Sequence, residues 1–143
     1  MRYELPSPYE EVPHTADVGV RARGADLAEA YARTALAMAQ LQAGGGPVEL
    51  QEERRLEARG EDRASLLVDL CRQVLKAFWL DRRLLAALEI DSLSDTALSA
   101  RAFFGRFDPE LHGEGMDIKA VTYARAAVEP VAGGYEGTLI FDI

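Results

Sequence analysis

Residues 9–23, YEEVPHTADVGVRAR, contain two short extended segments joined by a polar bend. Tyr9–Val12 and Val18–Arg23 alternate apolar and polar residues, which is the period of a half-buried β-strand. The bend between them carries the imidazole of His14, the hydroxyl of Thr15 and the carboxylate of Asp17. Functional side chains are commonly placed on such connections. The sequence therefore predicts two strands with a candidate site between them.

A second polar ending lies at the other end of the sequence, in Phe141-Asp142-Ile143. If this strand ends beside the bend, Asp17, Asp142 and the terminal carboxylate of Ile143 supply three hard anionic oxygen donors. Such a group repels itself unless a proton, a basic side chain or a cation neutralises it. Oxygen donors alone favour calcium, magnesium or manganese. The residues leave a second interpretation open, in which Asp17 caps a turn and Asp142 is simply solvated.

Length and composition predict one soluble domain over residues 1–143. The chain is long enough to bury a core without disulfides. No secretory signal or membrane-length apolar run is evident, so we expect a cytoplasmic protein. The formal net charge of −8 argues against direct, tight binding to RNA or DNA. The single cysteine, Cys71, has apolar neighbours at helical spacing and is expected to be a core residue rather than a nucleophile.

The remaining periodicity predicts two helices and five further strands after a loose arm over residues 1–8. The first helix, residues 26–41, begins with a capping pattern in Asp26 and Glu29. Residues 44–47 follow this helix and open a strand, so we interpret them as a linker rather than a phosphate-binding loop. The second helix, residues 61–78, is the most apolar and ends beside Trp79, an expected packing anchor. The five strands are residues 48–59 (a sheet edge, bulged at Arg54-Arg55), 85–93, 96–104, 118–129 and 135–141. Because no strand–helix–strand unit repeats, we predict an α+β fold, a mainly antiparallel sheet or sheets packed with two helices, in the order β-β-α-β-α-β-β-β-β.

A long irregular stretch, residues 105–117, precedes one of only two lysines in the chain. Lys119 begins a strand shortly after Asp117, where an ammonium group could meet carboxylates or a nucleotide phosphate. The alternative is a strand-edge lysine that discourages aggregation. The other lysine, Lys76, is expected to be exposed on the second helix. His112, within the irregular stretch, is expected to be merely solvated.

Three motifs, in order along the chain, resemble those of the archease family. They are HTADVG at residues 14–19, KAVTY at 119–123 and the terminal FDI at 141–143. The intervening sequence is similar as well, in ALAM at residues 35–38, in residues 62–70 and in residues 105–108. The resemblance therefore covers nearly the whole chain.

The resemblance implies a protein cofactor of the RtcB-type RNA ligase, which seals tRNA halves after intron removal. Such a cofactor promotes formation of the ligase–guanylate intermediate and multiple turnover, and is not itself a ligase. The implied partner is that ligase. The apolar pattern and the net charge predict no membrane and no direct tight nucleic-acid binding, and the protein is expected to be a monomer or a small homo-oligomer.

The resemblance also implies a bound divalent cation, calcium with magnesium or manganese as alternatives. Its ligands would be Asp17, Asp142 and Ile143. His14, Thr15, Lys119 and Asp117 are the residues expected to support this site or act on the partner.

Two positions depart from the family pattern. Ala124 stands where a histidine commonly follows the tyrosine of the second motif, and Arg106 stands where an acidic residue often follows the glycine before the irregular stretch. Any role of that histidine is therefore absent or displaced here. Neither change affects the three expected ligands.

Two other classes of function remain open from the residues. A small hydrolase could use His14 as general base with Asp17 orienting it, although the chain has no glycine-framed serine as nucleophile. A metal-free chaperone or adaptor could act through an exposed strand edge and the irregular stretch. Stability that depends on divalent ions would separate the adaptor from the metal-bearing cofactor.

Overall fold

The computed structural model describes residues 1–14 and 17–143. Along the chain it contains strands and helices with the following bounds: β1 Arg2–Glu4, β2 Glu10–His14, β3 Asp17–Gly24, α1 Leu27–Ala43, β4 Glu52–Arg59, α2 Arg63–Asp81, β5 Arg83–Leu93, β6 Ala97–Arg106, α3 Pro109–His112, β7 Ala120–Val131 and β8 Gly134–Asp142.

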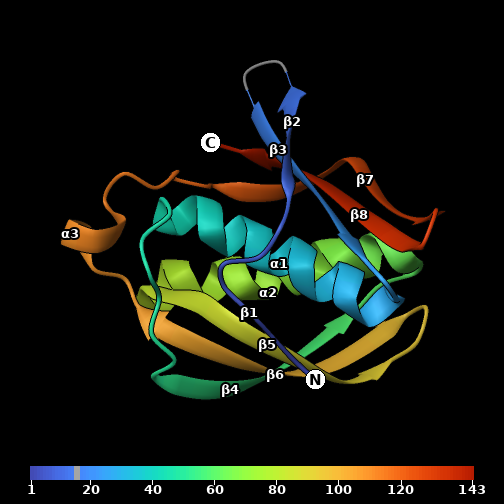
Figure 1. The fold of residues 1–143 in the computed structure, drawn as a ribbon, viewed down its shortest axis with the longest axis horizontal. Helices are drawn as coiled ribbons and strands as arrows, with labels where there is room; N and C mark the ends of the chain where they lie inside the picture. Colours follow the sequence, from blue (N-terminus) through green and yellow to red (C-terminus); the bar gives the residue numbers. More distant parts are fainter. Residues whose placement is uncertain (15–16) are drawn as a thin grey trace.

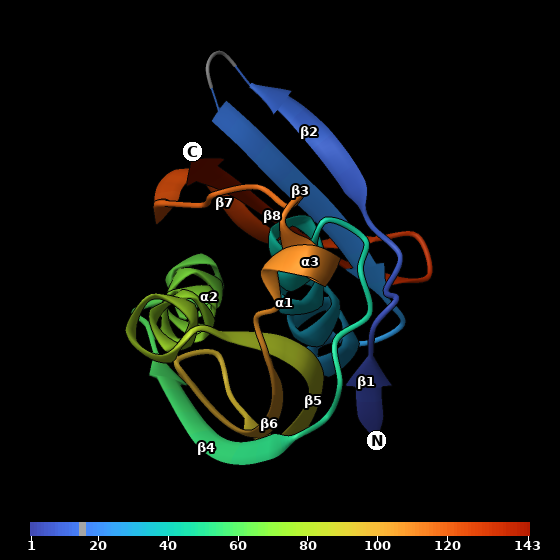
Figure 2. The same ribbon diagram turned by 90° about the vertical axis from the view of Figure 1, so that its left-hand side faces the viewer.

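The strands form two separate antiparallel sheets of four, with the two long helices between them. The first sheet has the order β1-β5-β6-β4 and the second has the order β2-β3-β8-β7. Figures 1 and 2 show α1 and α2 lying side by side in the middle layer, with one sheet on each side. The predicted α+β class and the predominance of antiparallel pairing are confirmed, and the prediction left open whether one sheet or two would form.

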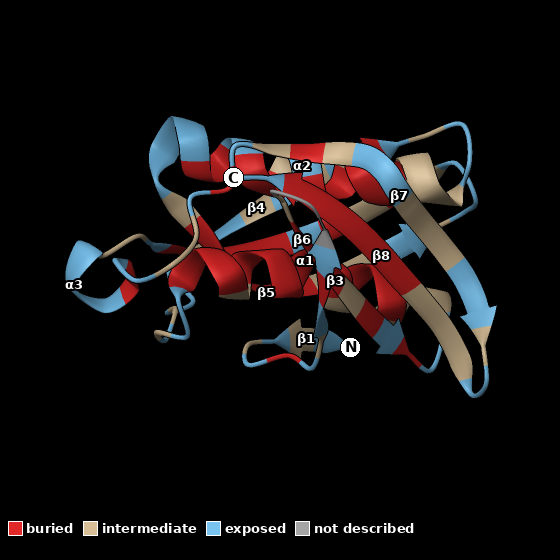
Figure 3. Cartoon of the chain, turned by 90° about the horizontal axis from the view of Figure 1, so that it is seen from above, coloured by how far each residue is buried: buried red, intermediate tan, exposed pale blue. Residues whose placement is uncertain are grey.

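Helix α1 is largely buried because each sheet covers one of its faces. Asp26 caps its start, since the Asp26 carboxylate accepts the backbone N–H of Glu29 at 2.8 Å, as the capping pattern predicted. Its end is set by Gly44, whose φ of 63° is left-handed. Seven of its 17 residues are alanines, which lets both sheets approach closely. Figure 3 shows most of the helix coloured as buried. Gly137 of β8 belongs to this close approach, because an added Cβ there would collide with the hydroxyl of Thr34.

Helix α2 supplies the larger apolar side chains of the same core. Asp62 and Ser65 form a capping box at its start. Its buried side chains are those that the sequence predicted as an apolar helix: Leu66, Leu67, Leu70, Cys71, Val74, Leu75 and Phe78. Burial raises the pKa of the Cys71 thiol, so this cysteine is a core residue and not a nucleophile.

Several expectations about the connections are wrong. Residues 2–4 form strand β1, which pairs with β5, instead of belonging to a loose arm. Strand β4 begins at Glu52 rather than at residue 48, and it pairs with β6 in unbroken register where a bulge at Arg54-Arg55 was expected. Its predicted edge position is confirmed. The irregular stretch after β6 contains the short helix α3.

Candidate functional site

The second sheet brings two chain segments of distant sequence to one end. Strands β3 and β8 are antiparallel, and the register that pairs Val18 with Phe141 makes Asp17 and Asp142 the next residues on the two strands. Val18 and Phe141 belong to the apolar core. Because side chains alternate along a strand, Asp17 and Asp142 point to the opposite, outer face of the sheet. Asp17 is half-buried and Asp142 is exposed.

The beginning of β7 joins the same end of the sheet. Ala120 pairs with Asp142. The backbone N–H of Lys119 donates to the carbonyl oxygen of Asp142 at 2.7 Å. The structure therefore gathers Asp17, Asp142 and Lys119 on three neighbouring strand ends. Ile143, the last residue of the sequence, is half-exposed directly after β8, and Asp117 is exposed two residues before Lys119.

The polar bend itself is only partly described. His14 ends β2 in register opposite Asp17. Thr15 lies outside the described residues. The expectation that these two residues support the site therefore rests on the backbone position of His14 and on the sequence.

The expected metal ligands are not all side chains. Among the described residues, no group of three or more His, Cys, Asp or Glu side chains could hold a metal ion. The expected set contains only two such side chains, from Asp17 and Asp142, because its third donor is the main-chain carboxylate of Ile143. The strand register supplies the two aspartates, and their joint binding of a cation stays a proposal.

Two side chains of α2 hold the edge of β7 that leads into this site. The guanidinium of Arg72 donates from Nε and Nη2 to the carbonyl oxygen of Val121, at 3.2 and 3.0 Å. The indole N–H of Trp79 donates to the carbonyl oxygen of Ile118 at 3.2 Å. Arg72 also lies 4.7 Å from the ring centre of Tyr123, a cation–π contact. These contacts fix the backbone on both sides of Lys119.

The sequence reasoning missed Arg72 and understated Trp79. Trp79 was expected to be a packing anchor, and it is 43% exposed with its indole N–H bonded to the strand edge at Ile118, a contact that the sequence did not indicate. Arg72 and Trp79 are seven residues apart, which places both on one face of a helix. That spacing was visible in the sequence, but it does not say which strand the face would meet.

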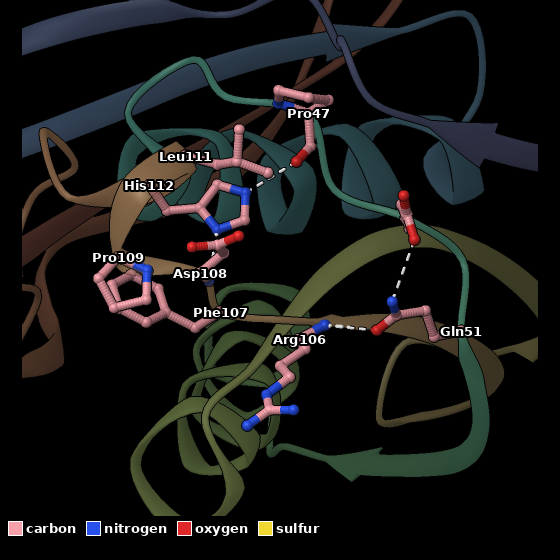
Figure 4. Close-up of a pocket in the computed structure, with 9 residues that line it drawn as sticks. Pro47, Gln51, Arg106, Phe107, Asp108, Pro109, Leu111 and His112 are labelled. Carbon is pink, nitrogen blue, oxygen red and sulfur yellow. Dashed lines mark hydrogen bonds between the residues drawn. The ribbon is translucent and has the colours of Figure 1, made fainter.

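His112 is buried, and the expectation that it is solvated is wrong. It is 2% exposed and lies in a pocket of about 440 Å³ next to Phe107 and Asp108 (Figure 4). Its Nδ1 accepts the backbone N–H of Asp108 at 2.9 Å, so the hydrogen must be on Nε2, which donates to the carbonyl oxygen of Pro47 at 2.7 Å. His112 thus ties the linker after α1 to α3, which is a structural role.

The two departures from the family pattern lie on exposed backbone. Arg106 ends β6 beside this pocket, and its backbone N–H donates to the side-chain carbonyl of Gln51 at 2.9 Å (Figure 4). Ala124 is an exposed residue of β7, where the register with β8 shifts between Thr122 and Ala127 as in a bulge. Lys76 is exposed on α2, as expected.

None of the described helices combines the length and the apolar character needed to cross a membrane.

Comparison with known proteins agrees with the fold and with the motifs. Residues 9–143 match the model of the Archease protein family (MTH1598/TM1083). The chain is 30% identical over 129 residues to protein archease of Pyrococcus abyssi, covering 88% of this chain and 91% of that protein. It is 30% identical over 139 residues to protein archease of Methanosarcina mazei, covering 94% of this chain and 95% of that protein.

Two solved structures have the same fold. The solution structure of Methanobacterium thermoautotrophicum protein 1598 superimposes with a TM-score of 0.74 at 31% identity, covering 94% of this chain and 98% of that one. The crystal structure of a Thermotoga maritima archease, described as a possible chaperone, gives a TM-score of 0.59 at 15% identity, covering 99% of both chains, and supports the fold alone. The family match over nearly the whole sequence, together with these relatives, places the chain in the archease family.

Proposed function

We propose that this archease is a non-catalytic cytoplasmic cofactor of an RtcB-type RNA ligase in tRNA splicing and RNA repair. It would promote guanylylation of the ligase and allow multiple turnover. The observation that carries the proposal is the meeting of Asp17, Asp142 and Lys119 on the ends of β3, β8 and β7. These residues belong to the three sequence motifs that resemble the family.

The donors at this end fit a hard divalent cation. Directly opposite residues of antiparallel strands carry their side chains on the same face, and the register makes Asp17 and Asp142 such neighbours. Asp17, Asp142 and the carboxylate of Ile143 would hold calcium, magnesium or manganese, because all three donors are hard anionic oxygens. A bound cation would supply charge neutralisation at phosphate oxygens.

The residues of the chain itself would position this charge. The hydrogen bond from the Lys119 amide fixes the backbone of Asp142, and the Arg72 and Trp79 contacts fix the strand that carries Lys119. The Lys119 ammonium group is exposed and can neutralise a phosphate of the partner's nucleotide. His14, Thr15 and Asp117 would contact the partner around it.

The acidic character of the chain supports a protein partner. With a formal net charge of −8 it is unsuited to bind an RNA strand along its surface. An acidic cofactor is suited to a partner that itself binds RNA and is therefore basic around its active site.

The test is RNA ligation by a purified RtcB-type ligase under multiple-turnover conditions, with divalent ion titrated. We expect the protein to stimulate ligation, and the Asp17→Asn variant to fold normally but give no stimulation, because one ligand charge is removed. The control is Glu57→Gln, an exposed carboxylate of β4 paired with Arg55 at 3.4 Å. Full stimulation by folded Asp17→Asn protein would refute the proposed site.

A metal-free adaptor is the second candidate, because β4 lies at an edge of the first sheet, where a partner could dock. The adaptor would be indifferent to divalent ions. If the unfolding temperature of the protein does not change with calcium, magnesium or manganese while the ligase is still stimulated, the adaptor interpretation replaces the metal-bearing one.

A further inference from the structure

A second pocket lies where the C-terminal ends of α1 and α2 meet the segment after β6. Its volume is about 360 Å³, which lies within the range of roughly 300–1,000 Å³ typical of small-molecule sites. Phe78, Trp79 and Phe107 line it. Phe78 meets Trp79 edge-on with ring centres 6.0 Å apart, and meets Phe107 edge-on at 5.4 Å. Three aromatic rings favour a ligand with a flat π face.

These aromatic walls are held in place by backbone contacts. The indole N–H of Trp79 donates a hydrogen bond to the carbonyl oxygen of Ile118. The backbone N–H of Phe107 donates to the carbonyl oxygen of Arg82 at 2.9 Å, which ties the end of β6 to the end of α2. A ligand would therefore meet a largely preformed pocket, which lowers the entropy cost of binding.

One buried polar atom of this pocket has no partner. Gln42, near the end of α1, lines the pocket and is 3% exposed. Within the described part of the chain, its Nε2 has no hydrogen-bond acceptor. Buried amide donors are nearly always satisfied in folded proteins. A carbonyl oxygen or a ring nitrogen of a ligand bound here would supply the acceptor that this N–H lacks.

Arg82 adds a cation to the same pocket. Its guanidinium carbon lies 5.0 Å from the ring centre of Phe78 and 5.6 Å from that of Trp79. Among the described residues, the ion pairs in this region are formed by its neighbours Asp81 and Arg83 and not by Arg82. Its φ of 53° is left-handed, a conformation in which glycine usually ends a helix. The exposed guanidinium of Arg82, which lies over two aromatic rings of the pocket, is available to an anion that binds there.

We propose that this pocket binds a mononucleotide. The base would lie against the aromatic walls and accept the Gln42 N–H, while Arg82 meets the phosphate. The Asp117 carboxylate also lines the pocket and can accept from an exocyclic amine of the base. A single nucleotide needs only one cation, so the acidic surface that disfavours an RNA strand does not exclude it. The proposal goes beyond ligase stimulation and does not depend on it.

Trp79 is the only tryptophan of the chain and lines the pocket, so its fluorescence reports binding directly. The purified protein is titrated with GMP, AMP and CMP, excited at the red edge of the indole band, with calorimetry in parallel. Ribose 5-phosphate tests the phosphate alone. We expect saturable quenching by at least one nucleotide and none by ribose 5-phosphate. Absence of saturable binding of all three nucleotides at millimolar concentration, or equal binding of ribose 5-phosphate, overturns the proposal.

Two variants separate binding from folding. Gln42→Leu removes the unpaired donor, and Arg82→Gly removes the guanidinium at a backbone position that suits glycine. We expect each to weaken nucleotide binding about tenfold or more, with an unfolding temperature at or above that of the unchanged protein.

The matched control is Arg125→Gly, because Arg125 is the other left-handed arginine, with φ 54°, and does not line the pocket. It should leave nucleotide affinity unchanged. Wild-type affinity in both pocket variants, or an equal loss in Arg125→Gly and Arg82→Gly, contradicts the assignment.

Discussion

The two sheets distribute their charged residues in opposite ways. On the first sheet, acidic and basic side chains alternate in chains of ion pairs: Glu89 pairs with Arg2 at 3.2 Å and with Arg101 at 3.0 Å, and Glu52 pairs with Arg54 at 2.6 Å and with Arg83 at 3.3 Å. Such exposed pairs solvate a surface and contribute little to stability.

On the second sheet, two aspartates lie at one end, beside the lysine that precedes β7. Asp17 and Asp142 are neighbours across β3 and β8, and Glu136 at the other end of β8 pairs with Arg21 and Arg23. The two sheets cover the same helices and share one core. What distinguishes them is that the first sheet carries chains of ion pairs, whereas the second brings two aspartates together at one end, where we propose a site.

The largest expected effect tests whether the sheets are one cooperative unit. Phe104 of the first sheet and Phe141 of the second are both fully buried in the shared core. We expect Phe104→Ala and Phe141→Ala each to lower the free energy of unfolding by about 3–5 kcal/mol, because each leaves a cavity. Urea unfolding measures this.

The same pair of variants should differ in function. At a temperature where both are folded, Phe104→Ala should still stimulate the ligase, whereas Phe141→Ala should not, because Phe141 precedes Asp142. Protection of the first sheet from hydrogen exchange while the second has opened in Phe141→Ala would show two units instead of one.

A smaller effect compares one carboxylate from each sheet. At a divalent-ion concentration about a hundredfold above the dissociation constant, binding to the folded state should stabilise the protein by about 2.7 kcal/mol. We expect Asp142→Asn to lose this stabilisation and Glu57→Gln of the first sheet to retain it. The measurement is thermal unfolding with and without the ion, and equal responses of the two variants would mean that the gathered aspartates bind no cation.

The smallest expected effect is on the pH dependence of stability, through the Asp62 carboxylate at the start of α2. The Asp62 carboxylate accepts the backbone N–H and the hydroxyl of Ser65, both at 2.8 Å, and these hydrogen bonds lower the pKa of Asp62 below its ordinary value of 3.8. Because the folded-state pKa is the lower one, the stabilisation is complete above pH 3.8 and is lost as pH falls through the folded-state pKa.

Asp62→Asn should keep the helix cap but lose this part of the acid dependence, whereas Asp62→Ala should lose both. Unfolding temperatures measured from about pH 2 to about pH 6, the range in which aspartates titrate, test this prediction. An Asp62→Asn variant with an unchanged acid profile would assign the profile to other carboxylates.

Much of the local structure follows from neighbouring residues. Asp26 and Asp62 were identifiable as helix starts, and the apolar side of α2 was identifiable from its spacing. The edge position of β4 followed from its density of charge. The prediction that this strand begins at residue 48 was wrong, because alternating apolar residues occur both in strands and in linkers that pack against a neighbouring segment.

The candidate site was predictable only in its parts. The aspartate after the bend and the aspartate near the end of the sequence both have residue types suited to a cation. Their adjacency depends on the pairing of β3 with β8, which no local pattern specifies. The contacts of Arg72 and Trp79 could not be predicted for the same reason. Their spacing defines a helix face, but the strand edge that they contact comes from a distant part of the chain.

By itself, the sequence determined the helix caps, the strands that alternate, the apolar core residues and the family, because each depends on near neighbours or on motifs. The tertiary structure decided the division into two sheets, the pairing of β1 with β5, the burial of His112 and the pocket at Gln42. These features arise from contacts between segments far apart in the chain, whose formation depends on how the whole core packs rather than on any local period.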